Sequence, residues 1–263
     1  MTLLAMLDAA ATGAVDVADG WGQGRATYGG LVAGLLVARA EVLTDDVERR
    51  LRVANTTFVG PVEPGAAQID GQVLRAGSGA TTVEARLLQG GEVRATLVAS
   101  FARPRETAVT VDEAGARPTI PDASEVEPVP FFAGLPEFLQ HVELRFAAGG
   151  AMFSGCDEAA FGGWMRWREP PARMGDRELI ALTDAWPPAI APRFAGPAPM
   201  SSLAWTFEPV GEAPGTPYDP AAHWQYDART LTASGGFAQT TARVWDASGT
   251  LRALSHQTVA YFR

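Results

Sequence analysis

Apolar residues recur along the chain in two patterns, one typical of a buried helix and one typical of strands. Residues 29–43 (GGLVAGLLVARAEVL) are apolar almost throughout until Arg39 and Glu41, which predicts a long buried helix. Gly-rich breaks at residues 77–79 and 90–91 predict hairpin turns. The strand-like runs that they separate are residues 52–59, 67–76, 81–89 and 93–102.

The second half of the chain repeats this order of elements. Strands are predicted around residues 141–146 and 151–156, before a Trp-rich stretch at 164–168. A helix around residues 176–186 is then stopped by Pro187 and Pro188. Four strand runs close the chain: residues 200–207, 224–233, 237–245 and 251–262. A helix followed by a meander of long strands predicts an α+β fold with antiparallel sheets, each wrapped around a helix.

Sequence similarity between the two halves supports this repeat. Residues 66–103 and 221–263 carry the same succession of strands and turns, with ARL at 85–87 matching ARV at 242–244. We therefore expect two half-domains, residues 1–103 and 131–263. The linker between them, residues 104–130, is rich in Pro, Glu, Asp and Ala, and we expect it to be exposed and extended.

Composition excludes several classes of function. The 263 residues carry a net charge of −9 and no run of Lys or Arg, which argues against nucleic-acid binding. Cys156 is the single cysteine, so we expect no disulfide framework. His141 and His223 have no Cys, Asp or Glu at ligand spacing, so we expect no metal site. No apolar stretch approaches the roughly 20 residues of a membrane span, and the first residues lack the basic region of a signal peptide. We expect a cytoplasmic protein.

Three stretches together carry a resemblance to a known family. They are residues 21–30 (WGQGRATYGG), 182–189 (LTDAWPPA) and 249–260 (GTLRALSHQTVA). In this order and spacing the chain resembles the hotdog fold, and its tandem form is similar to the double-hotdog acyl-CoA thioesterases of the type II family. The resemblance implies an acyl-CoA substrate, a role in fatty acid metabolism, no cofactor, and pairing of two double hotdogs into a homodimer.

The resemblance also implies a site in which Asp, a hydroxyl residue and Gln hold the attacking water. Asp184 and Gln257 match the Asp and the Gln. Met200 stands where a Thr is expected, and Ser201 and Ser202 follow it. Ser202 falls where an additional Asp can occur, so either serine could supply the hydroxyl.

Asp184 and Gln257 also have alternative interpretations. Asp184 follows the apolar run LIAL at 179–182, where a carboxylate without partners is costly. It could be a helix-capping or solvent-facing residue, but its match to the family motif, with Gly30 at about the same place in the first half, favours a functional role. Gln257 corresponds to Ala99 in the first half, and this asymmetry favours function. His256 is adjacent to Gln257 and should therefore point to the opposite face of its strand. One active site in the second half is the expectation.

Alternative interpretations remain at two places. Gly29 and Gly30, at the start of the first helix, could bind an anionic part of the substrate or could serve close packing. Met200 stands at the expected hydroxyl position, which favours a non-catalytic acyl-CoA-binding or scaffolding protein. Met200 is also a candidate substrate contact. A hotdog hydratase is a weaker alternative, because the chain has no Asp/His pair at the spacing that such enzymes use.

Overall fold

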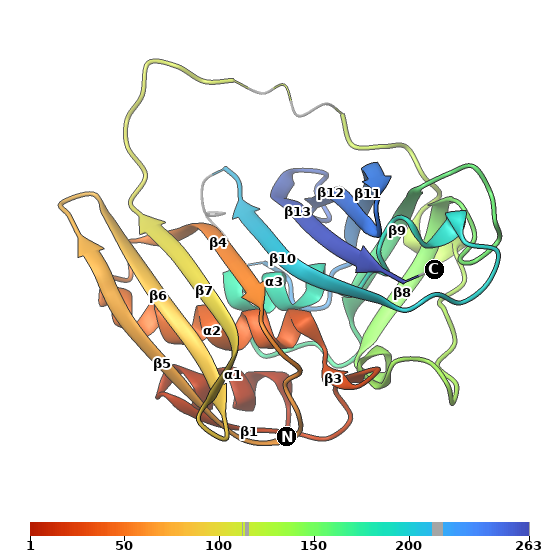
Figure 1. Cartoon of the computed structure of the whole chain (residues 1–263). Coiled ribbons are helices and arrows are strands. Elements are labelled where there is room, and N and C mark those ends of the chain that lie inside the picture. Colours follow the sequence, from red (N-terminus) through yellow and green to blue (C-terminus); the bar gives the residue numbers. More distant parts are fainter. Residues whose placement is uncertain (112, 114–115, 212–217, 263) are drawn as a thin grey trace.

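The fold is organised around a single long antiparallel sheet (Figure 1). The computed structural model describes residues 1–111, 113, 116–211 and 218–262. In this part of the chain, an 11-stranded sheet has the order β1-β5-β6-β7-β4-β10-β13-β12-β11-β9-β8. Its strands are β1 (Ala14–Val17), β4 (Arg50–Phe58), β5 (Gly65–Ala76), β6 (Ala80–Gln89), β7 (Glu92–Ala102), β8 (Val142–Gly149), β9 (Ala160–Trp167), β10 (Met200–Pro209), β11 (Trp224–Ser234), β12 (Phe237–Trp245) and β13 (Leu251–Tyr261). A separate hairpin pairs β2 (Gly22–Gln23) with β3 (Ala26–Thr27).

The two halves of the sheet have the same internal order. Strands β5-β6-β7-β4 lie on one side and β11-β12-β13-β10 on the other, reflected about the pair β4 and β10. These two central strands pair directly, with Trp205 opposite Thr56. The repeat predicted from the sequence therefore corresponds to a repeated strand order, and the halves share one continuous sheet.

Three described α-helices lie against the sheet: α1 (Leu3–Ala11), α2 (Gly29–Thr44) and α3 (Asp176–Thr183) (Figure 1). Helix α2 is buried along nearly its whole length, as its apolar sequence predicts. Two of its glycines, Gly30 and Gly34, face α3. A Cβ on Gly34 would lie 3.1 Å from the carbonyl oxygen of Arg177 and 3.2 Å from the Cβ of Ala181. The glycines therefore allow two helices from different halves to approach closely.

The secondary structure differs from the sequence-based expectation in a few places. Residues 151–156 do not form a strand, and the Trp-rich stretch instead belongs to β9. Phe153 and Gly155 both have positive φ values, of 56° and 67°, which an extended strand does not accommodate. The segment turns and bonds its N–H groups to backbone carbonyls of residues 191–194. Helix α1 and strand β1 were not predicted. Thr2 caps α1 by accepting a hydrogen bond from the N–H of Ala5.

The connection between the halves has two parts. Its described residues between Arg103 and Asp122 contain no helix or strand; residues 112, 114 and 115 lie outside the described part. From residue 118 onward the segment is fixed to the second half through its backbone carbonyls. Pro118 accepts a hydrogen bond from Gln225, and Pro121 accepts one from the indole of Trp164. The second part of the predicted linker therefore packs against the sheet.

The core extends through both halves. It contains one face of the sheet, most of α2 and α3, and the inward face of α1. Trp205, Trp224 and Trp245 are among its largest fully buried side chains. No helix in the described residues is long and apolar enough to cross a membrane.

Candidate active site

Asp184 lies at the C-terminal end of α3. This helix begins at Asp176, where the carboxylate of Glu178 accepts a hydrogen bond from the N–H of Gly175 at 2.9 Å. It ends at Thr183, whose hydroxyl donates to the carbonyl of Leu179. Asp184 is the C-cap residue and keeps an approximately helical backbone conformation. The short helix therefore projects the Asp184 carboxyl from its last turn.

Gln257 lies on β13 and reaches Asp184 across 73 residues of sequence. Its side-chain amide Nε2 donates a hydrogen bond to Asp184 Oδ1 at 2.5 Å. Gln257 is half-buried on the inner face, whereas the adjacent His256 is exposed. The structure thus brings together the two residues that the sequence singled out, and His256 points away as strand alternation requires.

A second contact to Asp184 comes from the first half of the chain. The backbone N–H of Gly30, in the first turn of α2, faces the Asp184 carboxylate closely enough to lower its pKa. The N–H groups of a first helical turn have no partner within the helix, and the helix dipole favours a negative charge there. The other carboxylate oxygen, Oδ2, lies 2.8 Å from the point that a Cβ on Gly29 would occupy.

These contacts leave Asp184 with a strongly perturbed carboxyl. Burial raises its pKa from 3.8 to about 7, although the hydrogen bond from Gln257 and the nearby N–H of Gly30 act in the opposite direction. Burial, together with the nearby Asp184 charge, also raises the pKa of Tyr28 and of Tyr226. Both tyrosines therefore stay protonated at neutral pH. A carboxyl group that titrates near pH 7 is suited to accept a proton from water and to return it.

The two candidate serines occupy different faces of β10. Ser202 pairs with Val259, whose side chain is buried on the same inner face as that of Gln257. Ser201 pairs with Ala260 and is exposed. No hydrogen bond joins either serine to Asp184 or Gln257 in the described residues. Sheet geometry therefore favours Ser202 as the hydroxyl residue, since paired residues lie on one face.

Met200 and the two glycines are also placed by the structure. Met200 is partly buried and packs against the core at the start of β10. Gly29 and Gly30 contact Asp184, and Gly30 also approaches the carbonyl of Ala181 too closely for a Cβ. These close approaches agree with the packing interpretation of the glycine pair. A contact of these residues with substrate stays a prediction.

Two residues near the pair were not predicted from the sequence. Tyr28, fully buried, donates a hydrogen bond from its hydroxyl to the carbonyl of Ala181 at 2.5 Å. Thr240 on β12 is buried directly opposite Gln257, and its hydroxyl lies 3.3 Å from that of Thr230. Tyr28 directly precedes the glycine pair, a signal that was available. Thr240 could be found only through the strand register.

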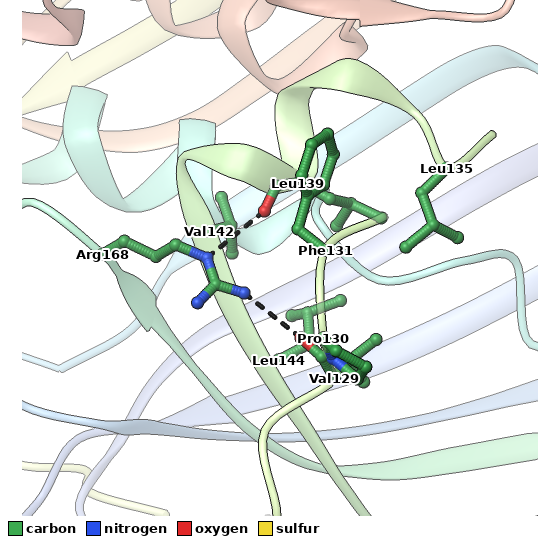
Figure 2. Close-up of a pocket in the computed structure, with 8 residues that line it drawn as sticks. All are labelled: Val129, Pro130, Phe131, Leu135, Leu139, Val142, Leu144 and Arg168. Carbon is green, nitrogen blue, oxygen red and sulfur yellow. Dashed lines mark hydrogen bonds between the residues drawn. The ribbon is translucent and has the colours of Figure 1, made fainter. Parts of the chain in front are cut away.

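Two hollows in the surface lie away from these residues. Figure 2 shows one, an apolar hollow closed by Arg168, which donates to the carbonyls of Val129 and Leu139. It measures about 10 Å³, which is room for about one water. The other, of about 980 Å³, opens at the far end of α2. Its acidic and basic side chains include the ion pair of Arg50 with Asp176 at 3.2 Å. Neither hollow is lined by a predicted site residue.

Comparison with solved structures identifies the fold class. A conserved protein of unknown function with a hot dog fold from Alicyclobacillus acidocaldarius matches with a TM-score of 0.83 and 21% identity, covering 98% of both chains. A tesB protein of Mycobacterium avium subsp. paratuberculosis matches with a TM-score of 0.77 and 16% identity, over 99% of this chain and 98% of that one. The acyl-CoA thioesterase II TesB2 of Mycobacterium marinum gives 0.69 and 18%, over 89% of each chain. The fold is a hotdog fold.

Family models place the chain more narrowly. Residues 17–102 match the acyl-CoA thioesterase N-terminal domain, and residues 112–261 match the acyl-CoA thioesterase C-terminal domain. The chain belongs to this thioesterase II-like family of hotdog proteins. No curated protein matches it in sequence.

Proposed function

We propose that the protein is an acyl-CoA thioesterase that hydrolyses its substrate with a water held by Asp184 and Gln257. The Asp184 carboxylate takes a proton as the water oxygen bonds to the thioester carbonyl carbon. The C–S bond then breaks, and the proton passes from Asp184 to the departing sulfur. The products are a free acid and CoA, and no covalent intermediate with the protein is required.

The observation that carries this proposal is the hydrogen-bonded pair of Asp184 and Gln257 in a chain of the thioesterase family. The pKa of Asp184, raised to about 7 by burial, is matched to proton transfer at neutral pH. The Gln257 amide can orient the water or donate to the carbonyl oxygen as it becomes negative. Ser202 is our candidate for the third water contact, and Ser201 is disfavoured by its exposure.

We also propose a double-hotdog organisation for the chain. The first half would span residues 1–103 and the second residues 131–263, joined by residues 104–130. The repeated strand order about β4 and β10 supports this division. In this arrangement the first half contributes the start of α2, with Gly29 and Gly30, and the second half contributes the two side chains. Gly29, Gly30 and Met200 are our candidates for substrate contact.

Release of free thiol from a panel of acyl-CoAs, from short to long chain, tests the function directly. We expect turnover for part of the panel, and loss of that turnover to background in Asp184→Asn. Asp16→Asn, an exposed change on β1 with the same loss of charge, should leave turnover unchanged. Tight acyl-CoA binding by calorimetry without thiol release would contradict the proposal and favour a non-catalytic binding protein.

A further inference from the structure

The Tyr28 hydroxyl contacts the backbone of the last turn of α3, whose Asp184 side chain is also bound by Gln257. The final carbonyls of an α-helix have no partner within the helix. Of these, the Ala181 carbonyl accepts the hydroxyl of Tyr28 at 2.5 Å. Ala181 lies three residues before Asp184. The bond therefore attaches the turn that carries Asp184 to the start of α2, where the Gly30 N–H faces the Asp184 carboxylate.

Tyr28 is itself fixed on several sides. Its side chain is fully buried, and its ring stacks on Phe138 with centroids 4.0 Å apart and planes 6° from parallel. Its backbone N–H donates to the carbonyl of Trp21 at 2.8 Å. A Cβ on Gly30 would lie 2.5 Å from the Tyr28 hydroxyl oxygen, so the ring occupies space that this glycine leaves open. A side chain fixed in this way can act as a rigid spacer between two helices.

We infer that Tyr28 is a positioning residue for the reaction, holding the last turn of α3 so that Asp184 stays on both the Gly30 N–H and the Gln257 amide. The inference rests on the proposed thioesterase function. Tyr28 does not act as an acid or base, because its hydroxyl proton is engaged with Ala181. Burial and the Asp184 charge also raise its pKa, which keeps the proton in place.

The consequence is a defined effect on proton transfer. Without the Tyr28 hydroxyl, the last turn of α3 is free to move away from α2, and the Gly30 N–H moves away from the Asp184 carboxylate. The nearby N–H lowers the pKa of Asp184, so its retreat moves the pKa upward. The acid limb of the pH–rate profile then shifts to higher pH. KM should change little, because a buried Tyr28 does not contact substrate.

The titratable groups around Asp184 support assigning the acid limb of the pH–rate profile to its carboxyl. Tyr28, the residue that precedes α2, and Tyr226 on β11 face it, and both are neutral at the pH of the assay. On β13, His256 points to the opposite face. On α3, the charged residues 176–178 lie in the first turn, at the other end of the helix. The limb therefore reports on Asp184.

The test compares Tyr28→Phe with Thr44→Val. Thr44 also donates a buried hydroxyl to a backbone carbonyl, that of Ala40 at 3.0 Å, but at the opposite end of α2. We expect Tyr28→Phe to lower kcat about tenfold or more, with KM within about twofold and an acid limb at higher pH. Thr44→Val should lose comparable thermal stability and keep wild-type kinetics.

Phe138→Leu provides a second variant in case Tyr28→Phe does not fold, because it loosens the stacking and keeps the hydroxyl. It should lower kcat and shift the limb in the same direction, more weakly. A folded Tyr28→Phe protein with wild-type kcat and a wild-type acid limb would overturn the inference. If Tyr28→Phe is unfolded, the same result in Phe138→Leu would overturn it. In either case, loss of thioesterase activity in Asp184→Asn would still support the proposed function. A wild-type protein without turnover would overturn both.

Discussion

Asp184→Asn should make the protein more stable at alkaline pH, because the raised pKa of this carboxyl has a thermodynamic cost. Burial raises the pKa from 3.8 to about 7. Between these pH values the folded protein keeps a proton that the unfolded chain has released. The free energy of unfolding of the wild type therefore falls as pH rises through this window. Above pH 7 Asp184 is ionised in both states, and the full cost remains.

The size of the effect follows from the same two pKa values. Their difference corresponds to about 4 kcal/mol at pH 8 and to less than about 2 kcal/mol at pH 5. Asparagine does not ionise, so the variant carries none of this cost. The stability difference between Asp184→Asn and wild type should grow by about 2–3 kcal/mol from pH 5 to pH 8. Glu41, whose pKa burial raises to about 8, contributes equally to both proteins and cancels.

Urea unfolding at the two pH values, followed by the fluorescence of the seven tryptophans, measures this difference. Asp16→Asn, which removes one exposed negative charge on β1, controls for net charge. For Asp16→Asn, we expect the difference in stability from wild type to be the same at both pH values. If the difference between Asp184→Asn and wild type is also the same at both pH values, Asp184 is an ordinary solvated carboxylate. The argument that it is a base tuned to neutral pH would then fail.

Two further substitutions test the geometry of the site. Gly29→Ala would place a methyl carbon 2.8 Å from Asp184 Oδ2 and should lower kcat by about tenfold or more. Gly77→Ala is the control, because the nearest atom to its added methyl would be 3.6 Å away, and it should leave kcat unchanged. Equal kcat in the two variants would exclude a role for the close approach of Gly29 to Asp184. Ser202→Ala should reduce kcat by at least about threefold, as loss of a water contact worth ~0.7 kcal/mol or more, and Ser201→Ala should not. A larger loss in Ser201→Ala would show that the inner face of β10 is assigned wrongly.

Much of the fold was predictable because it depends on local pattern. The apolar run at residues 29–43 and the Gly-rich breaks specify α2 and its meander with nearly correct bounds. The prediction was wrong at residues 151–156, where apolar residues suggested a strand. There the backbone turns at Phe153 and Gly155 because its hydrogen-bond partners lie in residues 191–194, a tertiary contact that periodicity does not contain.

The site, like the fold, was predictable only in part, because some of its contacts depend on packing between distant parts of the chain. The contact of Asp184 with Gln257 was expected from the family resemblance. The contact of Asp184 with Gly30 was not, because the sequence comparison treated Gly30 as the counterpart of Asp184 in a separate half. Only the close approach of α2 and α3 places them together. The expectation that the site is built in the second half therefore omitted a backbone donor from the first.

The division of this site between distant parts of the chain makes the protein suited to fragment complementation. If the chain were expressed as two pieces divided within the connection, one piece would carry Gly30 and the other would carry Asp184 and Gln257. Reassembly would require new edge-to-edge pairing of β4 with β10, where Thr206 also hydrogen-bonds to Asn55. Recovered turnover would then measure how well the two pieces recognise each other, with catalysis as the reporter of a protein–protein interface.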